Sequence, residues 1–252
     1  MRLTELLNKD EVTISCELFP PKQGAQLENY KNIVKDMAAL KPAYMSVTYG
    51  ATGGTSDYTV KLAEEVRNNN IPALAHLTCA SSTREKVASV IEELKAANIE
   101  NILALRGDIP ANADFPLPDQ YKHASELIAD IKAQGDFCIG GACYPEGHPE
   151  AATIFEDLDH LKEKVDAGCE FLTTQMFFDN NILYNFMYKA LKKGIDVPIV
   201  AGIMPVTNAS QIKRIFVRQY GSTEISCDRR QVWRQPGSNA SGGNCICNRA
   251  DH

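Results

Sequence analysis

The sequence lacks both an excess of positive charge and any long uninterrupted hydrophobic run. Its 252 residues carry 26 Lys and Arg against 32 Asp and Glu, which gives a formal net charge of -6 at pH 7. A nucleic-acid-binding or anionic-membrane-binding surface needs clustered positive charge, and a membrane-spanning helix needs about 20 consecutive apolar residues. We therefore expect small molecules or proteins as partners, and neither nucleic acid nor a membrane.

The N-terminal segment also lacks the pattern of a signal peptide. Residues 1–9, MRLTELLNK, are too short and too charged to form the apolar core of such a segment. We therefore expect a cytoplasmic protein.

A metal-binding spacing of cysteine and histidine is missing as well. Of the eight cysteines, only Cys245 and Cys247 form a close pair, and five others are isolated within apolar runs, as buried free thiols usually are. Those five are Cys16, Cys79, Cys138, Cys143 and Cys169. The histidines His76, His123, His148 and His160 do not cluster in sequence either. We predict no metal site.

What the sequence does contain is a regular alternation of strand-like and helix-like segments. With 44% hydrophobic residues, the chain can bury one large core. Strands are expected at 12–19, 43–49, 72–78, 101–106, 137–143, 170–176 and 197–202. Amphipathic helices are expected at 27–38, 57–69, 83–97, 120–134, 151–167 and 181–193. Ser82 and Glu85 form a candidate capping box, while Gly168 and Gly194 stand at expected helix ends.

This alternation predicts a parallel sheet, because each helix returns the chain to the same edge before the next strand begins. Seven strands follow one another without a linker, so a (β/α)8 TIM barrel is the first interpretation and a doubly wound sheet the second. No Gly-x-Gly-x-x-Gly follows any strand, and Gly50 to Gly54 have the wrong spacing for it. The dinucleotide-binding fold is accordingly disfavoured.

Polar residues follow or end the apolar run of six consecutive strands. They are Glu17, Thr48, His76 with Thr78, Arg106 with Asp108, Tyr144 and Gln175. In a barrel the carboxyl ends of the strands converge on one mouth, where such enzymes place their chemistry. Glu17 stands among apolar neighbours, where burial would raise its pKa and suit it to donate a proton.

Each of these residues also has a structural interpretation. His76 can be a satisfied core histidine, Glu17 a salt-bridged barrel residue and Tyr144 a turn residue. Arg106 and Asp108 can pair with neighbours at the margin of the core, where an unpaired charge costs several kcal/mol. Because polar residues from six strand ends converge, we favour a functional site over these structural interpretations.

Eight motifs in order resemble those of bacterial methylenetetrahydrofolate reductases. They are Ser15–Lys22 (SCELFPPK), Ser46–Ala51 (SVTYGA), His76–Cys79 (HLTC), Leu103–Asp108 (LALRGD), Tyr144–Glu150 (YPEGHPE), Lys164–Gly168 (KVDAG), Thr174–Asp179 (TQMFFD) and Gly202–Val206 (GIMPV). The resemblance runs from about Val12 to Ile215. It implies a (β/α)8 flavoprotein that binds FAD and takes hydride from NADH or NADPH. The hydride reduces 5,10-methylenetetrahydrofolate to 5-methyltetrahydrofolate, in one-carbon metabolism and methionine biosynthesis.

The resemblance also implies roles for individual residues. By position, Glu17 resembles the acid that protonates folate as its five-membered ring opens, Asp108 the residue that hydrogen-bonds the pterin and tunes the flavin, and Gln175 a pterin contact. Positions that contact FAD in the family are Thr48, His76, Arg106, Gly107, Asp108, Tyr144, His148, Asp157 and Lys164. Family members are often homo-oligomers, and some use an accessory electron-transfer subunit.

After Ile215 the pattern stops. Residues 216–252 have no sustained periodicity and little aliphatic content, so we expect a barrel domain at 1–215 and an aberrant, disordered tail at 216–252. A shifted back-translation of the tail can be written so that it ends in Gly-Ile-Ala-Tyr-Ala-Thr-Glu-Gln-Ile, which resembles the family's continuation. We therefore hypothesise a frameshift near Phe216, which would remove the eighth strand and leave the barrel open.

The rival interpretations of the function are a non-catalytic remnant and another folate-binding barrel, such as a methyltransferase without flavin.

The frameshift hypothesis predicts a family-like reading frame one nucleotide away in the gene. Sequencing of the coding DNA across codons 210 to 220 checks this. An intact frame with no family-like shifted translation would contradict the hypothesis.

Overall fold

The computed structural model describes residues 1–20, 27–49, 56–80, 82–109, 115–208 and 211. The expected tail at 216–252 and the proposed frameshift junction near Phe216 lie outside the described residues, so both stay predictions. The ends of two motifs, at 21–22 and 50–51, also lie outside them.

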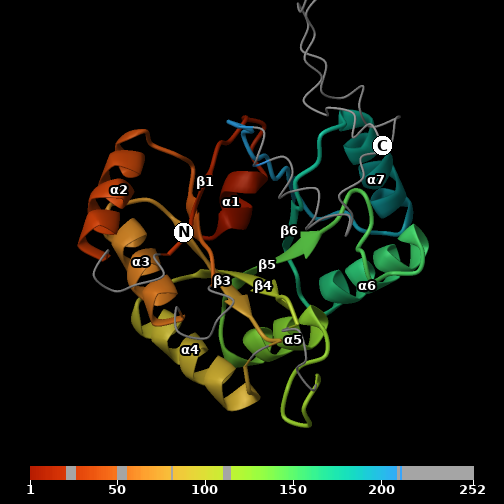
Figure 1. Cartoon of the computed structure of the whole chain (residues 1–252), viewed down its shortest axis with the longest axis horizontal. Coiled ribbons are helices and arrows are strands. Elements are labelled where there is room, and N and C mark those ends of the chain that lie inside the picture. The colour runs from red at the N-terminus through yellow and green to blue at the C-terminus, as the bar shows by residue number, and fades with distance from the viewer. Residues whose placement is uncertain (21–26, 50–55, 81, 110–114, 209–210, 212–252) are drawn as a thin grey trace, which may run out of the picture.

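Seven parallel strands form one sheet, in the order β1-β2-β3-β4-β5-β6-β7 (Figure 1). The strands are β1 Cys16–Leu18, β2 Met45–Val47, β3 Ala73–Thr78, β4 Asn101–Leu105, β5 Cys138–Cys143, β6 Phe171–Thr174 and β7 Ile199–Val200. The helices are α1 Leu3–Leu7, α2 Leu27–Ala39, α3 Ser56–Asn68, α4 Arg84–Ala96, α5 Ala124–Gln134, α6 Ile154–Asp166 and α7 Asn180–Lys192.

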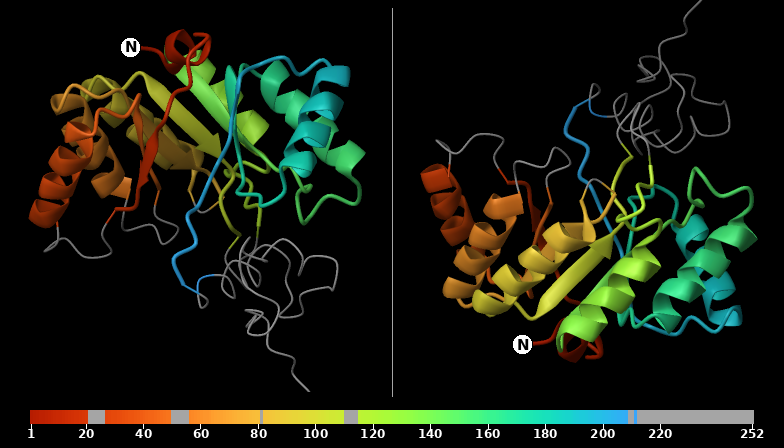
Figure 2. Two further views of the ribbon diagram at one scale, coloured as in Figure 1. Left: turned by 90° about the horizontal axis from the view of Figure 1, so that it is seen from above. Right: turned by 90° about the horizontal axis from the view of Figure 1, so that it is seen from below.

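The sheet curls, and helices α2 to α7 lie around its outer side (Figures 1 and 2). A doubly wound sheet would reverse its strand order and carry helices on both faces. The sequential order of all seven strands therefore excludes that alternative and confirms an incomplete barrel. Within the part of the chain that the structure describes, β1 and β7 are the two edges and do not pair with each other.

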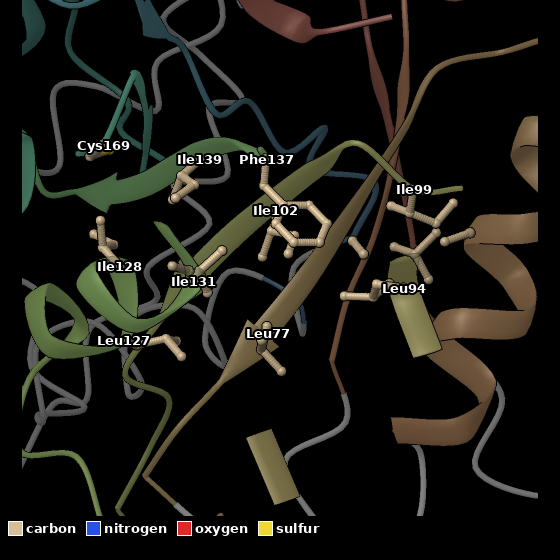
Figure 3. Close-up of a cluster of buried hydrophobic side chains, with 14 of the residues drawn as sticks. Leu77, Leu94, Ile99, Ile102, Leu127, Ile128, Ile131, Phe137, Ile139 and Cys169 are labelled. Carbon is tan, nitrogen blue, oxygen red and sulfur yellow. The ribbon is translucent and has the colours of Figure 1, made fainter. Parts of the chain in front are cut away.

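The larger apolar core lies between the sheet and the outer helices. Side chains of β3, β4 and β5 meet those of α4 and α5 there, as Leu77, Leu94, Ile102, Ile131 and Ile139 show (Figure 3). Each of these five is at most 1% exposed. The outer side chains of these strands are buried under helices, and their inner side chains are also buried. A strand buried on both faces appears in the sequence as a continuous apolar run, which explains the strand-like segments.

A smaller core fills the inside of the curled sheet. Leu74, Leu103, Cys138 and Phe171, from β3 to β6, pack there with Leu3 of α1. At Gly140, an added Cβ would lie only 2.3 Å from the Phe171 ring. Glycine at that position of β5 therefore gives the large ring its place inside the barrel.

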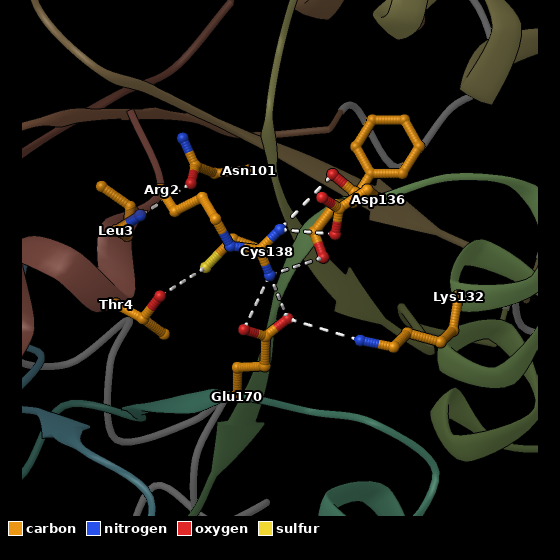
Figure 4. A network of polar contacts seen from close by, with 9 residues as sticks. Arg2, Leu3, Thr4, Asn101, Lys132, Asp136, Cys138 and Glu170 are labelled. Atoms are coloured by element: carbon orange, nitrogen blue, oxygen red, sulfur yellow. Dashed lines mark hydrogen bonds and ion pairs between the residues drawn. The ribbon is translucent and has the colours of Figure 1, made fainter.

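Helix α1 lies against the amino-terminal edge of the sheet and was not predicted. Arg2, just before it, donates to both carboxylate oxygens of Glu170 at 2.8 Å and to Asp136 Oδ1 at 2.7 Å (Figure 4). The backbone N–H of Leu3 donates to Asn101 Oδ1 at 2.8 Å. With only five residues, α1 is too short to show helical periodicity in sequence, and long-range contacts hold it.

Several local predictions need correction. Strand β1 begins at Cys16, four residues later than expected, and Val12 and Ile14 are 96% and 72% exposed. At α4 the N-cap is Thr83, whose hydroxyl accepts from the Lys86 N–H, so the capping box predicted at Ser82 is wrong by one residue. Gly168 and Gly194 do end helices with positive φ, at 117° and 76°. These glycines confirm the predicted ends of α6 and α7.

Asn101 links α1 to β3 at the amino-terminal edge of the sheet. Its side chain is buried, accepts from the Leu3 N–H and donates to Ala73 O at 3.0 Å. Asn101→Ala leaves two buried backbone groups unpaired, so urea unfolding should show a loss of about 1–3 kcal/mol in the free energy of unfolding. The control Asn181→Ala, on the exposed side of α7, should change it by less than about 0.5 kcal/mol. Equal urea midpoints for the two variants would contradict this role of Asn101.

Candidate functional site

The polar residues predicted at the strand ends do lie toward one edge of the sheet, because all seven strands are parallel. Thr48, Arg106, Tyr144 and Gln175 directly follow β2, β4, β5 and β6. Glu17 instead lies in the middle of the shortened β1. His76 and Thr78 lie within β3, two residues apart.

One open cleft of about 1640 Å³ collects most of the residues expected to hold the cofactor and substrate. The expected residues that line it are Arg106, Gly107, Asp108, Tyr144, His148, Asp157, Lys164 and Gln175. They come from the segments that follow β4, β5 and β6, and from α6. Glu17, Thr48 and His76 do not line this cleft and lie on or directly after the first three strands.

The backbone at Gly107 shapes the cleft where β4 ends. Gly107 has φ +83°, and an added Cβ would lie 3.0 Å from Thr78 Cβ. A residue with a side chain would be strained there and would press on β3. Asp108 follows directly, and its charge adds to burial in raising the pKa of the Tyr144 phenol.

Arg106 is already engaged with a carboxylate. Its two terminal nitrogens donate to the two oxygens of Glu150 at 2.7 and 2.6 Å. This forked pair holds the pKa of Glu150 below its usual range. A guanidinium has five N–H donors, and the pair uses two of them, so Arg106 can still donate to a second anion.

Lys164 brings a second cation to the cleft from α6. Its Nζ donates to Ala142 O at 2.9 Å, and burial lowers its pKa. Asp157, two turns earlier on α6, accepts from the His148 N–H at 3.1 Å. The rings of His148 and Tyr144 meet edge to face, with centroids 4.7 Å apart. The segment after β5 is therefore tied to α6 beside both cations.

A second polar group forms on the first three strands, around Glu17. Ser46 Oγ donates to Glu17 Oε2 at 3.4 Å, and His76 Nε2 lies 3.6 Å from the same oxygen. Burial raises the pKa of Glu17, as predicted, although 45% of its side chain is exposed. Burial lowers the pKa of His76 to about 4, so the imidazole is neutral at pH 7 and its contact with Glu17 is not an ion pair.

Gln175 and Thr48 are held mainly through their backbones. The Gln175 N–H donates to Cys143 O at 2.7 Å, which continues the pairing of β6 with β5. The Thr48 N–H donates to Leu18 O at 2.9 Å. The side chain of Gln175 is engaged as well, because its Oε1 accepts from the Met176 N–H at 2.9 Å.

Three features of the site escaped the sequence analysis. Ser46 and Glu150 lie within the quoted motifs, but no residue type in the pattern identified them as partners of Glu17 and Arg106. His160, which the sequence analysis did not place in the site, lines the cleft and stacks on His123 with 6.0 Å between ring centroids. Helix α6 and the start of α5 lie far apart in sequence, so spacing could not reveal this contact.

The structure confirms the predicted buried thiols for four of the five cysteines, while Cys16 is only partly buried. All five described cysteines are free, and burial raises the pKa of the Cys79, Cys143 and Cys169 thiols to about 12. Thiols with such a pKa are poor nucleophiles at neutral pH. Among the described residues, no three His, Cys, Asp or Glu side chains gather as a metal site would require. Nor is any described helix both long and apolar enough to cross a membrane.

A smaller recess of about 520 Å³ opens at the amino-terminal edge of the sheet. Arg67, Lys95, Glu100, Asn101 and Asp136 are among its lining residues. None of the residues predicted to act in catalysis or binding lies there. In barrels this edge generally serves stability, while chemistry occupies the opposite edge.

Sequence comparisons place the chain among named enzymes. A family model described as methylenetetrahydrofolate reductase matches residues 2–225. The 5,10-methylenetetrahydrofolate reductases of Pectobacterium carotovorum and Escherichia coli are 38% and 37% identical over 81% of this chain, which covers 67% and 68% of their lengths. A maize protein named methylenetetrahydrofolate reductase (NADH) 1 is 37% identical over 82% of the chain and 37% of its own length.

Comparison with solved structures supports the fold alone. An uncharacterised Clostridium thermocellum protein that binds two copies of 5-methyl-5,6,7,8-tetrahydrofolic acid superimposes with a TM-score of 0.59 at 16% identity, over 88% of this chain and 75% of that one. An oxaloacetate acetylhydrolase gives a TM-score of 0.55 at 13% identity, over 89% and 88%. A folate-binding protein and an oxaloacetate acetylhydrolase thus share this fold, so the site, rather than the barrel, must identify the reaction.

Proposed function

The chain belongs to the methylenetetrahydrofolate reductase family, and we propose that it reduces 5,10-methylenetetrahydrofolate to 5-methyltetrahydrofolate with FAD and NADH or NADPH. The observation that carries this proposal is the cleft in which eight residues at family positions meet, although they come from separate parts of the chain.

The cleft fits a dinucleotide cofactor on its own chemistry. A diphosphate needs cationic donors, and Arg106 and Lys164 both line the cleft, with three N–H donors of Arg106 left over from its pair with Glu150. Gly107, which has no side chain, lets the backbone itself line the cleft beside Arg106. We assign Thr48, His76, Tyr144, His148 and Asp157 to the same cofactor by family position. Bound FAD would supply the hydride transfer, which no side chain can perform.

The protein's own part in the reaction is to hold the folate and move one proton. Asp108, at the carboxyl end of β4, would hydrogen-bond the pterin, and the Gln175 amide would contact it from the end of β6. Glu17 would donate its proton to the folate nitrogen that leaves the five-membered ring. A raised pKa keeps a larger share of Glu17 protonated near neutral pH, as a general acid requires.

Binding of FAD tests the cofactor assignment. Purified protein should show the absorption spectrum of oxidised flavin, which bleaches with NADH or NADPH and recovers with methylenetetrahydrofolate. Lys164→Gln removes one cation from the cleft and should weaken FAD binding about tenfold or more, as loss of a charge-assisted hydrogen bond does. The control Lys162→Gln removes a cation that pairs with Asp166 on α6 and does not line the cleft, so it should bind FAD normally.

Other outcomes of that experiment support the rival functions. A colourless, well-folded protein that binds folate would favour a flavin-free folate barrel, such as a methyltransferase. A colourless, aggregated product would favour a non-catalytic remnant. An accessory electron-transfer subunit and a homo-oligomer stay predictions, as does a cytoplasmic location.

Substitution of Glu17 tests the proton donor. Glu17→Gln keeps the shape of the side chain but removes the acidic proton, so the rate of folate reduction should fall by about 10²- to 10⁴-fold. Reduction of bound flavin by the nicotinamide should stay normal, because that half-reaction does not need the folate proton. Stopped-flow absorbance separates the two half-reactions. Full folate turnover in this variant would show that Glu17 is not the acid.

A further inference from the structure

The inner surface of β1, β2 and β3 carries three polar side chains on one face. Glu17 is paired in register with Ser46, and Ser46 with Leu74, whose side chain belongs to the inner core. His76 stands two residues beyond Leu74 on β3 and therefore points to the same side. The carboxyl, hydroxyl and imidazole thus meet just above the inner core.

His76 is buried with an unsatisfied ring nitrogen. Its side chain is 8% exposed, and Nε2 has no hydrogen-bond partner among the described residues. Native structures seldom leave a buried polar atom unpaired, and such an atom in a site calls for an explanation. The nearby group that Nε2 faces is Glu17 Oε2, at 3.6 Å, slightly beyond hydrogen-bond distance.

The surroundings of Glu17 favour the uncharged acid. Burial raises its pKa, while the hydrogen bond from Ser46 works in the opposite direction. Burial is the main cause of the raised pKa of Tyr44, just before β2, and the charge of Glu17 adds to it. His76 gives Glu17 no positive charge at neutral pH, since burial lowers the pKa of the imidazole to about 4. A neutral carboxylic O–H and a neutral imidazole nitrogen are complementary, as donor and acceptor.

We propose that His76 is a positioning residue for the proton of Glu17: Nε2 accepts a hydrogen bond from the protonated carboxyl and holds the proton on Oε2. This proposal rests on the proposed function of Glu17 as the acid. It gives His76 a second task beside the cofactor contact that its family position implies. The ring proton of His76 must then lie on Nδ1.

The proton transfer balances with water as the only further reactant. The folate nitrogen becomes more basic as its bond to the one-carbon unit breaks, so the Oε2–H bond breaks while an N–H bond forms. Glu17 is left as a carboxylate, and the Ser46 hydroxyl already points a hydrogen-bond donor at that oxygen. Water restores the proton before the next turnover. The electron pair of the broken bond to the one-carbon unit stays on the nitrogen, so the step involves no net oxidation or reduction.

The first test measures the carboxyl directly, with no need for turnover. In protein labelled with [δ-¹³C]glutamate, the resonance of Glu17 is the one that Glu17→Gln removes, and its pH titration gives the pKa. His76→Leu removes the acceptor without adding a polar group, and the apparent pKa of Glu17 should fall by about one unit, a tenfold change in protonation equilibrium. His76→Gln keeps an acceptor oxygen and should restore part of the shift.

Ser46→Ala is the control with the opposite sign. Ser46 stabilises the carboxylate, so its removal should raise the pKa of Glu17. A general loosening of the site by mutation would shift both variants in the same direction. Opposite shifts in His76→Leu and Ser46→Ala would separate the proposed hydrogen bond from such loosening.

The second test needs only the wild-type chain and holds even if His76→Leu fails to fold. The ¹⁵N chemical shifts of His76 should show an unprotonated Nε2 and a protonated Nδ1 at neutral pH. A protonated Nε2, or an unchanged pKa of Glu17 in a folded His76→Leu, would overturn the proposal. If the hydrogen bond is found but Glu17→Gln still reduces folate, the proposed acid role fails while the positioning contact stands.

Discussion

The packing inside the curled sheet is the constraint on which the rest of the structure depends. Phe171 fills the space that Gly140 leaves open and meets Leu74 and Leu103, so the amino-terminal half of the barrel interior is solid and apolar. Polar side chains can then enter the interior only above this layer, toward the carboxyl ends of the strands. Helix α1 closes the opposite edge with Leu3, so the layer is sealed from below. The position of the site follows from this division.

Above that layer, the residues of the cleft and the residues around Glu17 differ in their electrostatics. Arg106, paired with Glu150, and the partly buried Lys164 place positive charge in an open cleft, where an anionic ligand can reach it. Glu17 and His76 instead lie close together, and burial shifts the pKa of each toward its uncharged form. The first arrangement suits the binding of a diphosphate, and the second suits the storage of a proton. Parallel neighbouring strands bring the two groups into one barrel.

Much of this architecture could be predicted from local pattern. Seven strands and six helices lie where periodicity indicated, and Gly168 and Gly194 end their helices as expected. The errors occur where partners distant in sequence decide the outcome. Strand β1 is shorter than its alternation of apolar and polar residues because it is an edge of the sheet, and Val12 and Ile14 meet solvent. Helix α1 is held in place by the contact between Arg2 and Glu170, and no local sequence pattern predicts a contact between residues so far apart.

The sequence by itself determined the fold class, the parallel order of the strands and the residue types at the strand ends, because hydrophobic periodicity and turn residues act over short distances. Its motifs also identified the family. Only the tertiary structure decided that Arg106 pairs with Glu150, that Ser46 and His76 face one oxygen of Glu17, and that Glu17 lies apart from the cleft. Ser46 lies 29 residues after Glu17 in the sequence and His76 lies 59 residues after it, while Glu150 lies 44 residues after Arg106. Burial and distance, which set charge states and hydrogen bonds, arise only when such segments pack together.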